Sequence, residues 1–418
     1  MKNRFWWALI SSLFALCVSA EADTLLVDGE GVNQNDVLLA QQPAVRPLPS
    51  QSGSPLQPMP PLTTPPSAPP DLNALAQVGP LNNVNSSART PGYSLASTTN
   101  MIGDTLGVGF FFKVEGMGGK PPQVAGNVPQ GDGTIKISED CSPLPVDRVF
   151  FDYNHFENAL VTANGTDISL NRYTVGVEKT FLNGLGSVEI KLPFDSGVSA
   201  IQSTTATTPD NQGTLFGTMA ITPKILLFQN DQWAMSAGLG VGLPTSPNAG
   251  LNALTEQIRV FDDAVHVAPF VGLLLTPNER WFSITYLQFD FDTTGDRVTV
   301  DGTPEGTLRD PTLMYVDCSV GYWLFNNRLG TGGGEYLTGM APILELHYTK
   351  ALDDAMGIQP FIEPESNTIN ALNLTAGFFF QLGSSSGLTV AGVAPLRTSR
   401  ADKQFDAEVL VQFNRWFY

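Results

Sequence analysis

The chain has 418 residues, of which 15% are charged and 42% apolar, with 40 glycines, so it could form two ordinary domains or one large all-β domain. Its mean hydropathy of +0.00 excludes a polytopic helical membrane protein, which needs repeated apolar spans of about 20 residues, but fits a barrel whose strands are half polar. The formal net charge of −18 argues against nucleic acid as a partner, because nucleic acid binds clustered Lys and Arg.

The first residues have the parts of an export signal. Lys2 and Arg4 supply positive charge, residues 5–18 form an apolar core, and small residues around Ala20 offer a cleavage site. We therefore predict that residues 1–22 are a cleaved signal peptide. A retained helical anchor is the alternative, although the apolar run is shorter than the roughly 20 residues that a span requires.

Residues 23–100 contain little that could fold. Prolines recur between Pro43 and Pro70, and each proline removes a backbone donor and favours extended geometry. We predict a disordered periplasmic spacer, with contact to the cell wall as its alternative role. Residues 101–146 include the apolar, glycine-rich run 106–112, and they are predicted to be either a lead-in to the fold or a plug that tucks into it.

From residue 147 onward the pattern becomes regular, with twelve apolar segments separated by turn formers. Most of these segments approach or exceed the roughly 9–11 residues that a tilted strand needs to cross a bilayer, whereas strands of soluble proteins average about 5–6. Their length therefore favours a membrane barrel. The predicted strands are 147–156, 168–181, 185–194, 215–228, 233–243, 265–275, 281–291, 312–325, 336–349, 369–382, 388–396 and 405–417.

Short connections alternate with long ones along these strands. The short ones carry tight-turn chemistry, as in Asn183-Gly184 and Asn230-Asp231. Outer-membrane barrels have short periplasmic turns and long external loops, and an even strand number places both chain ends on the periplasmic side. A soluble β-sandwich has no physical reason for this regularity. The long connections are 195–214, 244–264, 292–310 and 351–368.

Apolar and polar side chains alternate within the strands, as in residues 187–194, where Val188 and Ile190 oppose Glu189 and Lys191. A charge that faced lipid would cost roughly 2–4 kcal/mol near the midplane, so the charged faces should line the lumen. They would form either a constriction that selects solutes or a salt-bridge network that fills a narrow lumen. The candidate lumen-lining residues are Arg148, Asp152, Arg172, Glu178, Glu189, Lys191, Asp317, Glu345, His347 and Glu408.

The last strand carries the clearest alternation. Val409, Val411 and Phe413 share one face, whereas Glu408 and Gln412 share the other, and the chain ends in three aromatic residues. This strand resembles the terminal strand of bacterial outer-membrane β-barrel proteins, and the resemblance implies that the barrel-assembly machinery reads it. In a closed barrel it must pair with the first predicted strand. Aromatic residues near strand ends fit the two interfacial girdles of such barrels; they include Phe194, Trp233, Trp281, Trp323, Tyr336, Tyr348 and Trp416.

Residues 137–156, ISEDCSPLPVDRVFFDYNHF, and residues 170–181, LNRYTVGVEKTF, resemble uncharacterised exported proteins of planctomycete-type bacteria. Members of that group are thought to be outer-membrane barrels. The resemblance implies a barrel from about Asn100 to the end of the chain and supplies no activity.

No pattern of a catalytic or metal centre stands out. None of the three histidines precedes Asp and Ser, and no Gly-x-Ser-x-Gly or His-Glu-x-x-His motif occurs. Residues 290–296, DFDTTGD, could hold calcium, but they lack the spacing of a calcium-binding loop, and an acidic external loop is the favoured interpretation. We expect no catalytic residue, cofactor or metal, and we expect Cys141 and Cys318 to stay unpaired.

The sequence thus predicts an all-β fold, a transmembrane antiparallel up-and-down β-barrel of about 12 strands spanning 147–418. Its predicted function is a porin-like outer-membrane channel for passive diffusion of small hydrophilic solutes, not an enzyme. A structural or adhesive barrel with a filled lumen and an exported soluble β-sandwich are the alternatives. The predicted partners are outer-membrane lipid, the assembly machinery and, through the proline-rich segment, the cell wall. The oligomeric state stays open.

Overall fold

The structure is a computed structural model. It describes residues 98–104, 110–114, 123–127, 134–161, 167–197, 199–203, 214–253, 256–327, 330, 332–364, 369–399 and 402–417. The predicted signal peptide and nearly all of the predicted spacer lie outside this range. Within it, no helix is long and apolar enough to cross a membrane.

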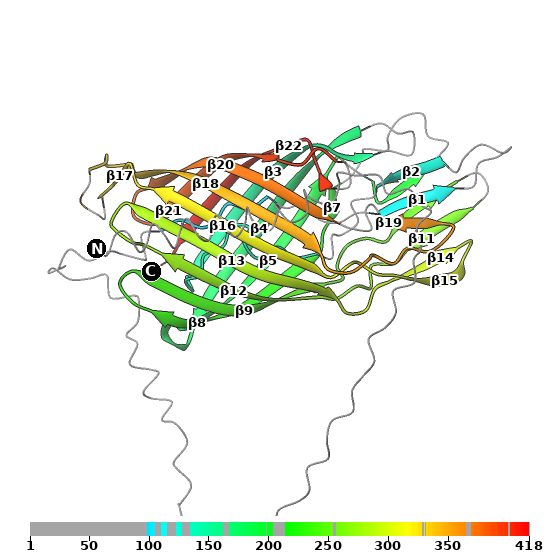
Figure 1. Cartoon of the computed structure of the whole chain (residues 1–418), viewed down its shortest axis with the longest axis horizontal. Helices are drawn as coiled ribbons and strands as arrows, with labels where there is room; N and C mark the ends of the chain where they lie inside the picture. The colour runs from blue at the N-terminus through cyan, green and yellow to red at the C-terminus, as the bar shows by residue number, and fades with distance from the viewer. Residues whose placement is uncertain are drawn as a thin grey trace, which may run out of the picture. The chain divides into compact units, whose positions relative to one another are not determined.

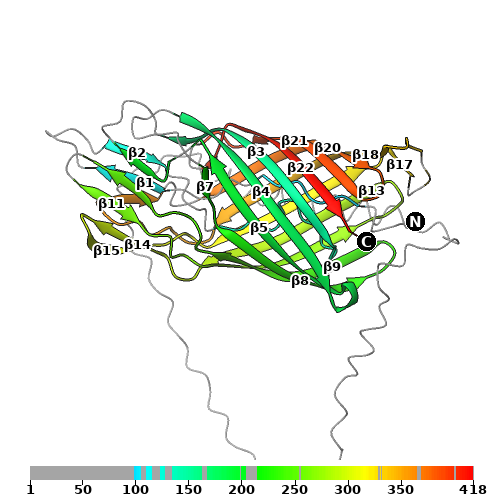
Figure 2. The same cartoon turned by 180° about the vertical axis from the view of Figure 1, so that it is seen from behind.

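Twelve antiparallel strands form a closed barrel (Figures 1 and 2), which confirms the predicted fold. Each strand pairs with two neighbours. The alternative of a soluble β-sandwich is wrong, because a sandwich would leave edge strands and this ladder has none. The strands are β3 (Arg148–Val161), β4 (Asp167–Phe181), β5 (Gly186–Ser196), β8 (Met219–Gln229), β9 (Trp233–Leu243), β12 (His266–Leu275), β13 (Trp281–Asp292), β16 (Leu313–Tyr322), β18 (Leu337–Ala351), β20 (Asn370–Leu382), β21 (Ser386–Pro395) and β22 (Ala407–Trp416).

The closing pair is the one that the sequence predicts. Strand β22 pairs with β3 from Ala407 opposite Glu157 to Trp416 opposite Arg148. Along β22, Val409 is 52% exposed, whereas Glu408 and Gln412 are both 1% exposed. The alternating pattern therefore sets the two faces of this strand, with the apolar side chains outward.

The outer face of the barrel is apolar and exposed. A folded chain in water would bury such side chains, and their contiguous spread over the outside is typical of a surface that meets lipid. The exposed apolar residues of the barrel strands include Val149, Phe151, Val175, Val177, Ile225, Leu227, Leu239, Val271, Leu287, Leu344, Phe378, Val390, Val409 and Phe413.

Tight turns join the strands at one end of the barrel. Leu182, Asn183 and Gly184 all have positive φ angles, between 51° and 84°, and this explains why Asn and Gly occupy that turn. The Asn230 side chain accepts hydrogen bonds from the backbone of Gln232 and Trp233 at the next turn. At the same end lies β17 (Phe325–Asn326), paired with β18.

The prediction of an exposed aromatic at Trp323 is wrong. Its side chain is 2% exposed and packs against Phe282 and Phe379, with ring centroids 5.9 Å away in both cases. Tyr348 is also buried, at 3% exposure. Cys141 and Cys318, the cysteines among the described residues, are both thiols, as predicted.

At the opposite end the long connections are not irregular loops, as the sequence suggested, but carry strands of two small sheets, one of which is completed by two strands that precede the barrel (Figure 1). Their strands bury a shared apolar cluster that contains Leu251, Ile258 and Val298, each 0% exposed. One sheet comprises β6 (Ile201–Ser203), β10 (Ala249–Asn252), β11 (Gln257–Val260), β14 (Asp296–Val300) and β15 (Thr303–Leu308); the other comprises β1 (Phe110–Val114), β2 (Gln123–Asn127) and β19 (Ile362–Pro364), while β7 (Thr214–Phe216) extends β5.

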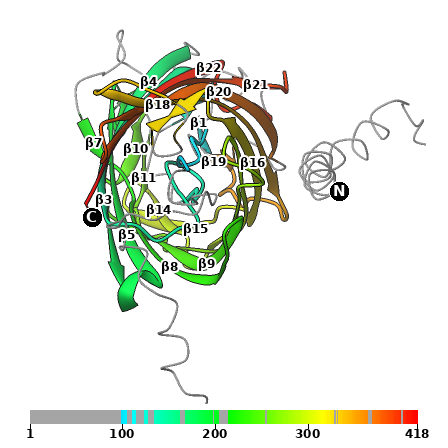
Figure 3. The same ribbon diagram turned by 90° about the vertical axis from the view of Figure 1, so that its left-hand side faces the viewer.

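Two stretches that precede β3 run inside the barrel (Figure 3). We call residues 98–104 the first arm, residues 134–146 the returning arm, and both together the inner segment. The arms meet where the Met101 amide donates to the Cys141 carbonyl oxygen at 2.9 Å. Ile102 packs in one cluster with Phe156 and Leu410 of the wall, so the segment lies within the ring of strands.

Candidate functional site

Backbone amides of the inner segment point at polar side chains of the barrel wall. The Glu345 carboxylate on β18 accepts from the amides of Ile102, at 2.9 Å and 3.0 Å, and Gly103, at 3.1 Å. On the returning arm, the Ile135 amide donates to Asp290 at 2.8 Å and the Ile137 amide donates to the Gln288 side chain at 2.8 Å. Side chains of β13 and β18 thus supply acceptors for donors that would otherwise be buried unpaired.

The first buried charge cluster centres on Arg148 at the start of β3. Its guanidinium donates to Glu178 at 3.0 Å, to Glu189 at 2.5 Å and to Asp140 of the returning arm at 2.9 Å. Lys224 lies 2.9 Å from Glu178 and donates to the Ser142 carbonyl oxygen at 2.7 Å. This network, which we call the Arg148 cluster, ties the returning arm to the wall.

A neighbouring glycine makes room for the Arg148 cluster. The guanidinium lies over the Phe150 ring, 4.3 Å from its centroid. Phe150 faces Gly176 across the β3–β4 pair, and a Cβ atom at Gly176 would lie only 2.0 Å from that ring. A side chain at residue 176 would displace the ring and the arginine that rests on it.

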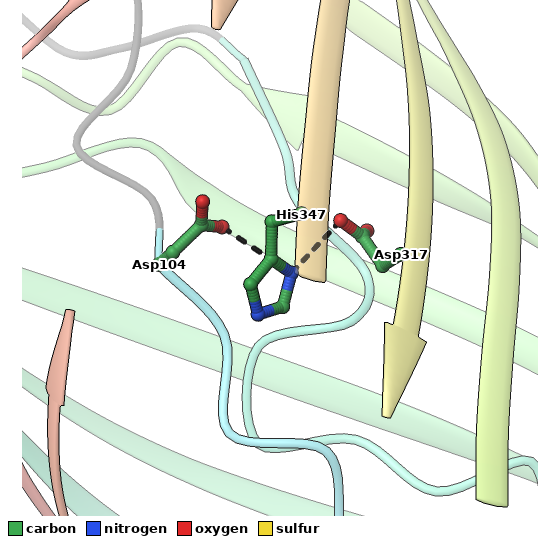
Figure 4. A group of neighbouring side chains, drawn as sticks. All are labelled: Asp104, Asp317 and His347. Atoms are coloured by element: carbon green, nitrogen blue, oxygen red, sulfur yellow. Dashed lines mark hydrogen bonds and ion pairs between the residues drawn. The ribbon is translucent and has the colours of Figure 1, made fainter. Parts of the chain in front are cut away.

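The second buried cluster joins the first arm, the returning arm and two strands. His347 on β18 lies opposite Asp317 on β16, and its Nδ1 is 2.9 Å from Asp317 Oδ1 and 3.6 Å from Asp104 Oδ1 (Figure 4). Its Nε2 lies 3.0 Å from Glu345. Lys136 contacts Asp104 and lies 3.1 Å from Asp317. We call these five residues the Asp104 cluster.

Burial and neighbouring charges shift the pKa values of Lys136 and Cys141 on the returning arm. Burial lowers the pKa of Lys136, but the charges of Asp104 and Asp317 outweigh this effect and raise it above its ordinary value. The lysine is therefore a permanent cation. Burial raises the pKa of the Cys141 thiol, so this buried thiol is a poor nucleophile while the arm stays in place.

A small cavity of about 70 Å³ lies between the returning arm and β4, β5 and β8. Arg172 on β4 and Asp195 on β5 form a 2.8 Å ion pair on its wall. Lys136 and Glu139 of the arm and Lys191 of β5 complete the charged part of its lining. The cavity is large enough for water and has charged groups in its lining, so the inner segment does not fill the interior completely.

Carboxylates outnumber cations inside the barrel. The buried set holds ten carboxyl groups and four Lys or Arg side chains, besides two buried histidines. The carboxylates are Asp104, Asp140, Asp152, Glu178, Glu189, Asp195, Asp290, Asp317, Glu345 and Glu408; the cations are Lys136, Arg148, Lys191 and Lys224.

The sequence-predicted lumen residues divide among these features. Arg148, Glu178, Glu189 and Lys191 belong to or adjoin the Arg148 cluster. Asp317, Glu345 and His347 belong to the Asp104 cluster, and Arg172 lines the cavity. Asp152 and Glu408 are buried and belong to neither cluster; Glu408 accepts from Asn154 at 2.6 Å, whereas its second oxygen has no hydrogen-bond partner in the part of the chain that the structure describes.

Sequence reasoning missed several members of these networks. Lys224 and Asp290 lie on inward faces of strands, where the same alternation that revealed the other residues would have found them. Asp104, Lys136 and Asp140 lie in arms without strand periodicity, so no local signal marks them.

Among the residues that the structure describes, one group could hold a metal ion. Asp104, Asp317 and His347 are all buried, and one ligand atom from each lies within 4.8 Å of the others. In the acidic stretch 290–296, which was considered as a calcium site, the Asp292 carboxylate accepts hydrogen bonds from the Thr294 and Gly295 amides at 3.1 Å and 2.7 Å. Its carboxylate therefore caps a turn.

A closed barrel with an apolar exposed outside and a charged inside defines the class of transmembrane β-barrels of the outer-membrane type. No protein-family model matches the chain, and no curated protein matches it.

Solved structures with a similar fold include an outer membrane channel from Pseudomonas putida F1, at 10% identity and a TM-score of 0.43, covering 66% of this chain and 97% of that one. The NanC porin matches at 8% identity and a TM-score of 0.38, covering 65% and 99%. The toluene transporter TbuX of Ralstonia pickettii matches at 9% identity and a TM-score of 0.31, covering 65% and 90%. Likeness at this level carries no argument about function.

Proposed function

We propose that this protein is an outer-membrane channel for small hydrophilic solutes and that the inner segment closes it in the arrangement seen here. The observation that carries the proposal is the polarity of the interior. A permanently filled core would gain stability from apolar packing, because buried ion pairs are often no better than apolar residues of similar volume. This wall instead presents eight buried carboxyl groups and three buried Lys or Arg side chains, a surface suited to contact with water.

Besides its apolar packing, the inner segment is attached by polar contacts that water could replace. The Ile102, Gly103, Ile135 and Ile137 amides donate to wall side chains rather than to a strand ladder, and the Lys136 ion pairs hold the arms. Removal of the arms would leave a hydrated, charged lumen within an intact ladder. Twelve strands lie between eight, whose interior side chains fill, and sixteen, which leave an aqueous channel.

The excess of carboxyl groups over Lys and Arg side chains should make the proposed channel prefer cations to anions. Rings of acidic side chains favour cations, and a low-dielectric wall strengthens the field that a solute meets. We therefore expect current to be carried mainly by cations. A reversal potential of the cation-selective sign under a KCl gradient would support this, and an anion-selective sign would contradict it.

Single-channel recording in planar bilayers tests the proposal on the full-length exported chain. Wild type should give small or infrequent current steps, because the inner segment occupies the lumen. Lys136→Met removes the cation that ties both arms to Asp317 and should raise the frequency of openings by roughly tenfold. Lys179→Met is the matched control, because Lys179 pairs with Asp147 while being 76% exposed.

A structural barrel with a filled lumen is the second candidate, and the occupied interior is the observation that favours it. If neither wild type nor Lys136→Met gives steps above those of lipid alone, while both proteins show the altered gel mobility of a folded barrel, the channel proposal fails and the structural role stands.

Further expectations from the sequence belong with this proposal. We propose that residues 1–22 direct export, that β22 is read by the assembly machinery, and that the proline-rich stretch reaches toward the cell wall. The orientation of β22, with its apolar side chains outward, supports its recognition as a terminal strand. The resemblance to planctomycete-type exported proteins stays a prediction.

A further inference from the structure

The carboxylates and the imidazole of the Asp104 cluster have the arrangement of a metal centre. Asp317 and His347 come from adjacent strands at directly opposite positions, so the barrel itself fixes two of the three ligands, and Asp104 of the first arm supplies the third. His347 Nδ1 lies 2.9 Å from Asp317 Oδ1 and 3.6 Å from Asp104 Oδ1. Ligand atoms around a tetrahedral zinc ion are separated by roughly 3.3–3.6 Å.

The Glu345 carboxylate orients the His347 imidazole for metal binding by holding the ring nitrogen that faces away from the aspartates. His347 Nε2 faces the Glu345 carboxylate at 3.0 Å, and the amides of Ile102 and Gly103 hold that carboxylate in place. A carboxylate that accepts from one ring nitrogen of a metal-binding histidine fixes the tautomer and leaves the other nitrogen as the ligand. Here the other nitrogen, Nδ1, points at the two aspartates.

An independent observation points to a ligand at this place. Asp317 is 0% exposed, and its Oδ2 atom accepts no hydrogen bond of ordinary geometry among the described residues; the nearby hydroxyl of Ser138, which interacts with Asp317, also lacks such a bond. A buried carboxylate oxygen without a donor is costly unless something binds it. Asp104 Oδ2, in contrast, accepts from Asn373 at 2.7 Å. The unsatisfied oxygen thus lies on a wall residue that stays in place if the arms move.

Lys136 occupies the position of a cation in this arrangement. Its ammonium group contacts Asp104 and lies 3.1 Å from Asp317 Oδ1. Three carboxylates, those of Asp104, Asp317 and Glu345, face this single lysine and one imidazole. Both ring nitrogens of His347 lie within hydrogen-bond distance of carboxylate oxygens, which can only accept, so the ring is an imidazolium and the cluster carries a net charge of −1. A divalent ion in place of the ammonium group and the Nδ1 proton would leave that net charge unchanged.

We propose that Asp104, Asp317 and His347 form a divalent transition-metal site and that Lys136 is its tethered competitor, a cation supplied by the returning arm. Binding of the ion expels the ammonium group, releases the Nδ1 proton of His347 to solvent and removes one tie between that arm and the wall. Two carboxylates and one imidazole suit Zn²⁺, Co²⁺ or Mn²⁺ and leave an open coordination position. The consequence for solute passage rests on the channel proposed above, whereas the site itself does not.

Titration with Co²⁺ tests the site, because this ion acquires a visible absorption band in a tetrahedral environment. The full-length exported chain is titrated in detergent as wild type, Lys136→Met and Lys191→Met. Lys191 is the matched control, since it is another buried lysine that pairs with a carboxylate, Glu189, at 3.4 Å. We expect Lys136→Met to bind Co²⁺ on the order of tenfold more tightly than wild type, and Lys191→Met to bind as wild type does.

Removal of the wall ligands completes the test. Asp317→Asn or His347→Gln, each added to Lys136→Met, should lower the affinity by roughly tenfold or more. Heat-dependent gel mobility shows whether each variant is folded, and a variant that fails this check is replaced by Asp104→Asn. Equal affinity of Lys136→Met and Lys191→Met, or tight binding that survives loss of the ligands, would overturn the proposal. Co²⁺ binding without bilayer currents would refute the channel and leave the site standing.

Discussion

The barrel wall is held together by backbone hydrogen bonds between strands, whereas the inner segment is held in place by side-chain contacts. The wall is a continuous ladder in which each of twelve strands pairs with two others. The arms meet each other at an isolated bridge, between Met101 and Cys141, and are held to the wall by apolar packing, as at Ile102, and by polar side chains such as Glu345 and Lys136. A ladder is lost only by unfolding, whereas ion pairs can be exchanged for water or another ion. The two parts should therefore respond differently to substitution.

Arg148 contacts both the barrel wall and the returning arm, so its substitution should have the largest effect on stability. Its side chain is 0% exposed and meets Asp140 of the returning arm as well as Glu178 and Glu189 of the wall. Arg148→Met leaves three buried carboxylates without that partner, so the free energy of unfolding should fall by about 3–5 kcal/mol. Guanidinium unfolding in detergent, followed by tryptophan fluorescence, measures the change.

The control for Arg148→Met is Arg297→Met at the loop end. Arg297 is 67% exposed and pairs with Asp263 at 2.5 Å, and exposed ion pairs contribute only about 0–1 kcal/mol. A loss at Arg148 no larger than the loss at Arg297 would show that the buried cluster does not hold the wall and the arm together.

A charge on the outside should damage the wall alone. Val411 lies in the middle of β22 with its side chain on the apolar face. Val411→Arg should lower the free energy of unfolding in lipid by about 2–4 kcal/mol, because the charge would lie near the bilayer midplane. Ile201→Arg, at a 41% exposed position in β6, should change it by less than about 0.5 kcal/mol. Equal effects would indicate that the apolar face of β22 does not meet lipid.

Loss of Lys136 should loosen the inner segment and spare the wall. Cys141 reports on this, since its thiol is 1% exposed. With Cys17 and Cys318 replaced by Ser, Lys136→Met should speed alkylation of Cys141 by about tenfold, which corresponds to about 1.4 kcal/mol of easier local opening. Guanidinium unfolding of the wall should stay within about 1 kcal/mol of wild type. An unchanged alkylation rate would show that Lys136 does not retain the arm.

The same contrast explains how much could be predicted from the sequence. Strand β9 (Trp233–Leu243) matches the predicted range at both ends, because alternation and turn chemistry act over neighbouring residues. The pairing of β22 with β3 then follows from closure. Strand β15 (Thr303–Leu308) was missed because its six residues include Pro and Gly, which are depleted in strands.

The position of the inner segment could not be predicted because its contacts are specific and distant in sequence. Lys136 meets Asp104, 32 residues away, and Asp317, 181 residues further on. No periodicity links such residues, and the arms are too irregular to give a strand signal. Sequence reasoning therefore found the wall half of the Asp104 cluster, Asp317, Glu345 and His347, and missed the half that the arms supply.

The smallest expected effect lies at the loop end, where stability should depend on pH. Burial and neighbouring carboxylates raise the pKa of Asp262 to about 7, of Asp296 to about 6 and of Asp310 to about 7. Folding there favours the protonated acids, so their contribution is fully present below about pH 4 and is lost as the pH rises through 6 to 7. Hydrogen-exchange protection of β10 and β14 should be greater at pH 5 than at pH 8. Asp310→Asn should weaken that dependence, whereas amides of β9 should show none; an opposite trend would mean that these carboxylates are ionised and stabilised by partners in the folded loop end.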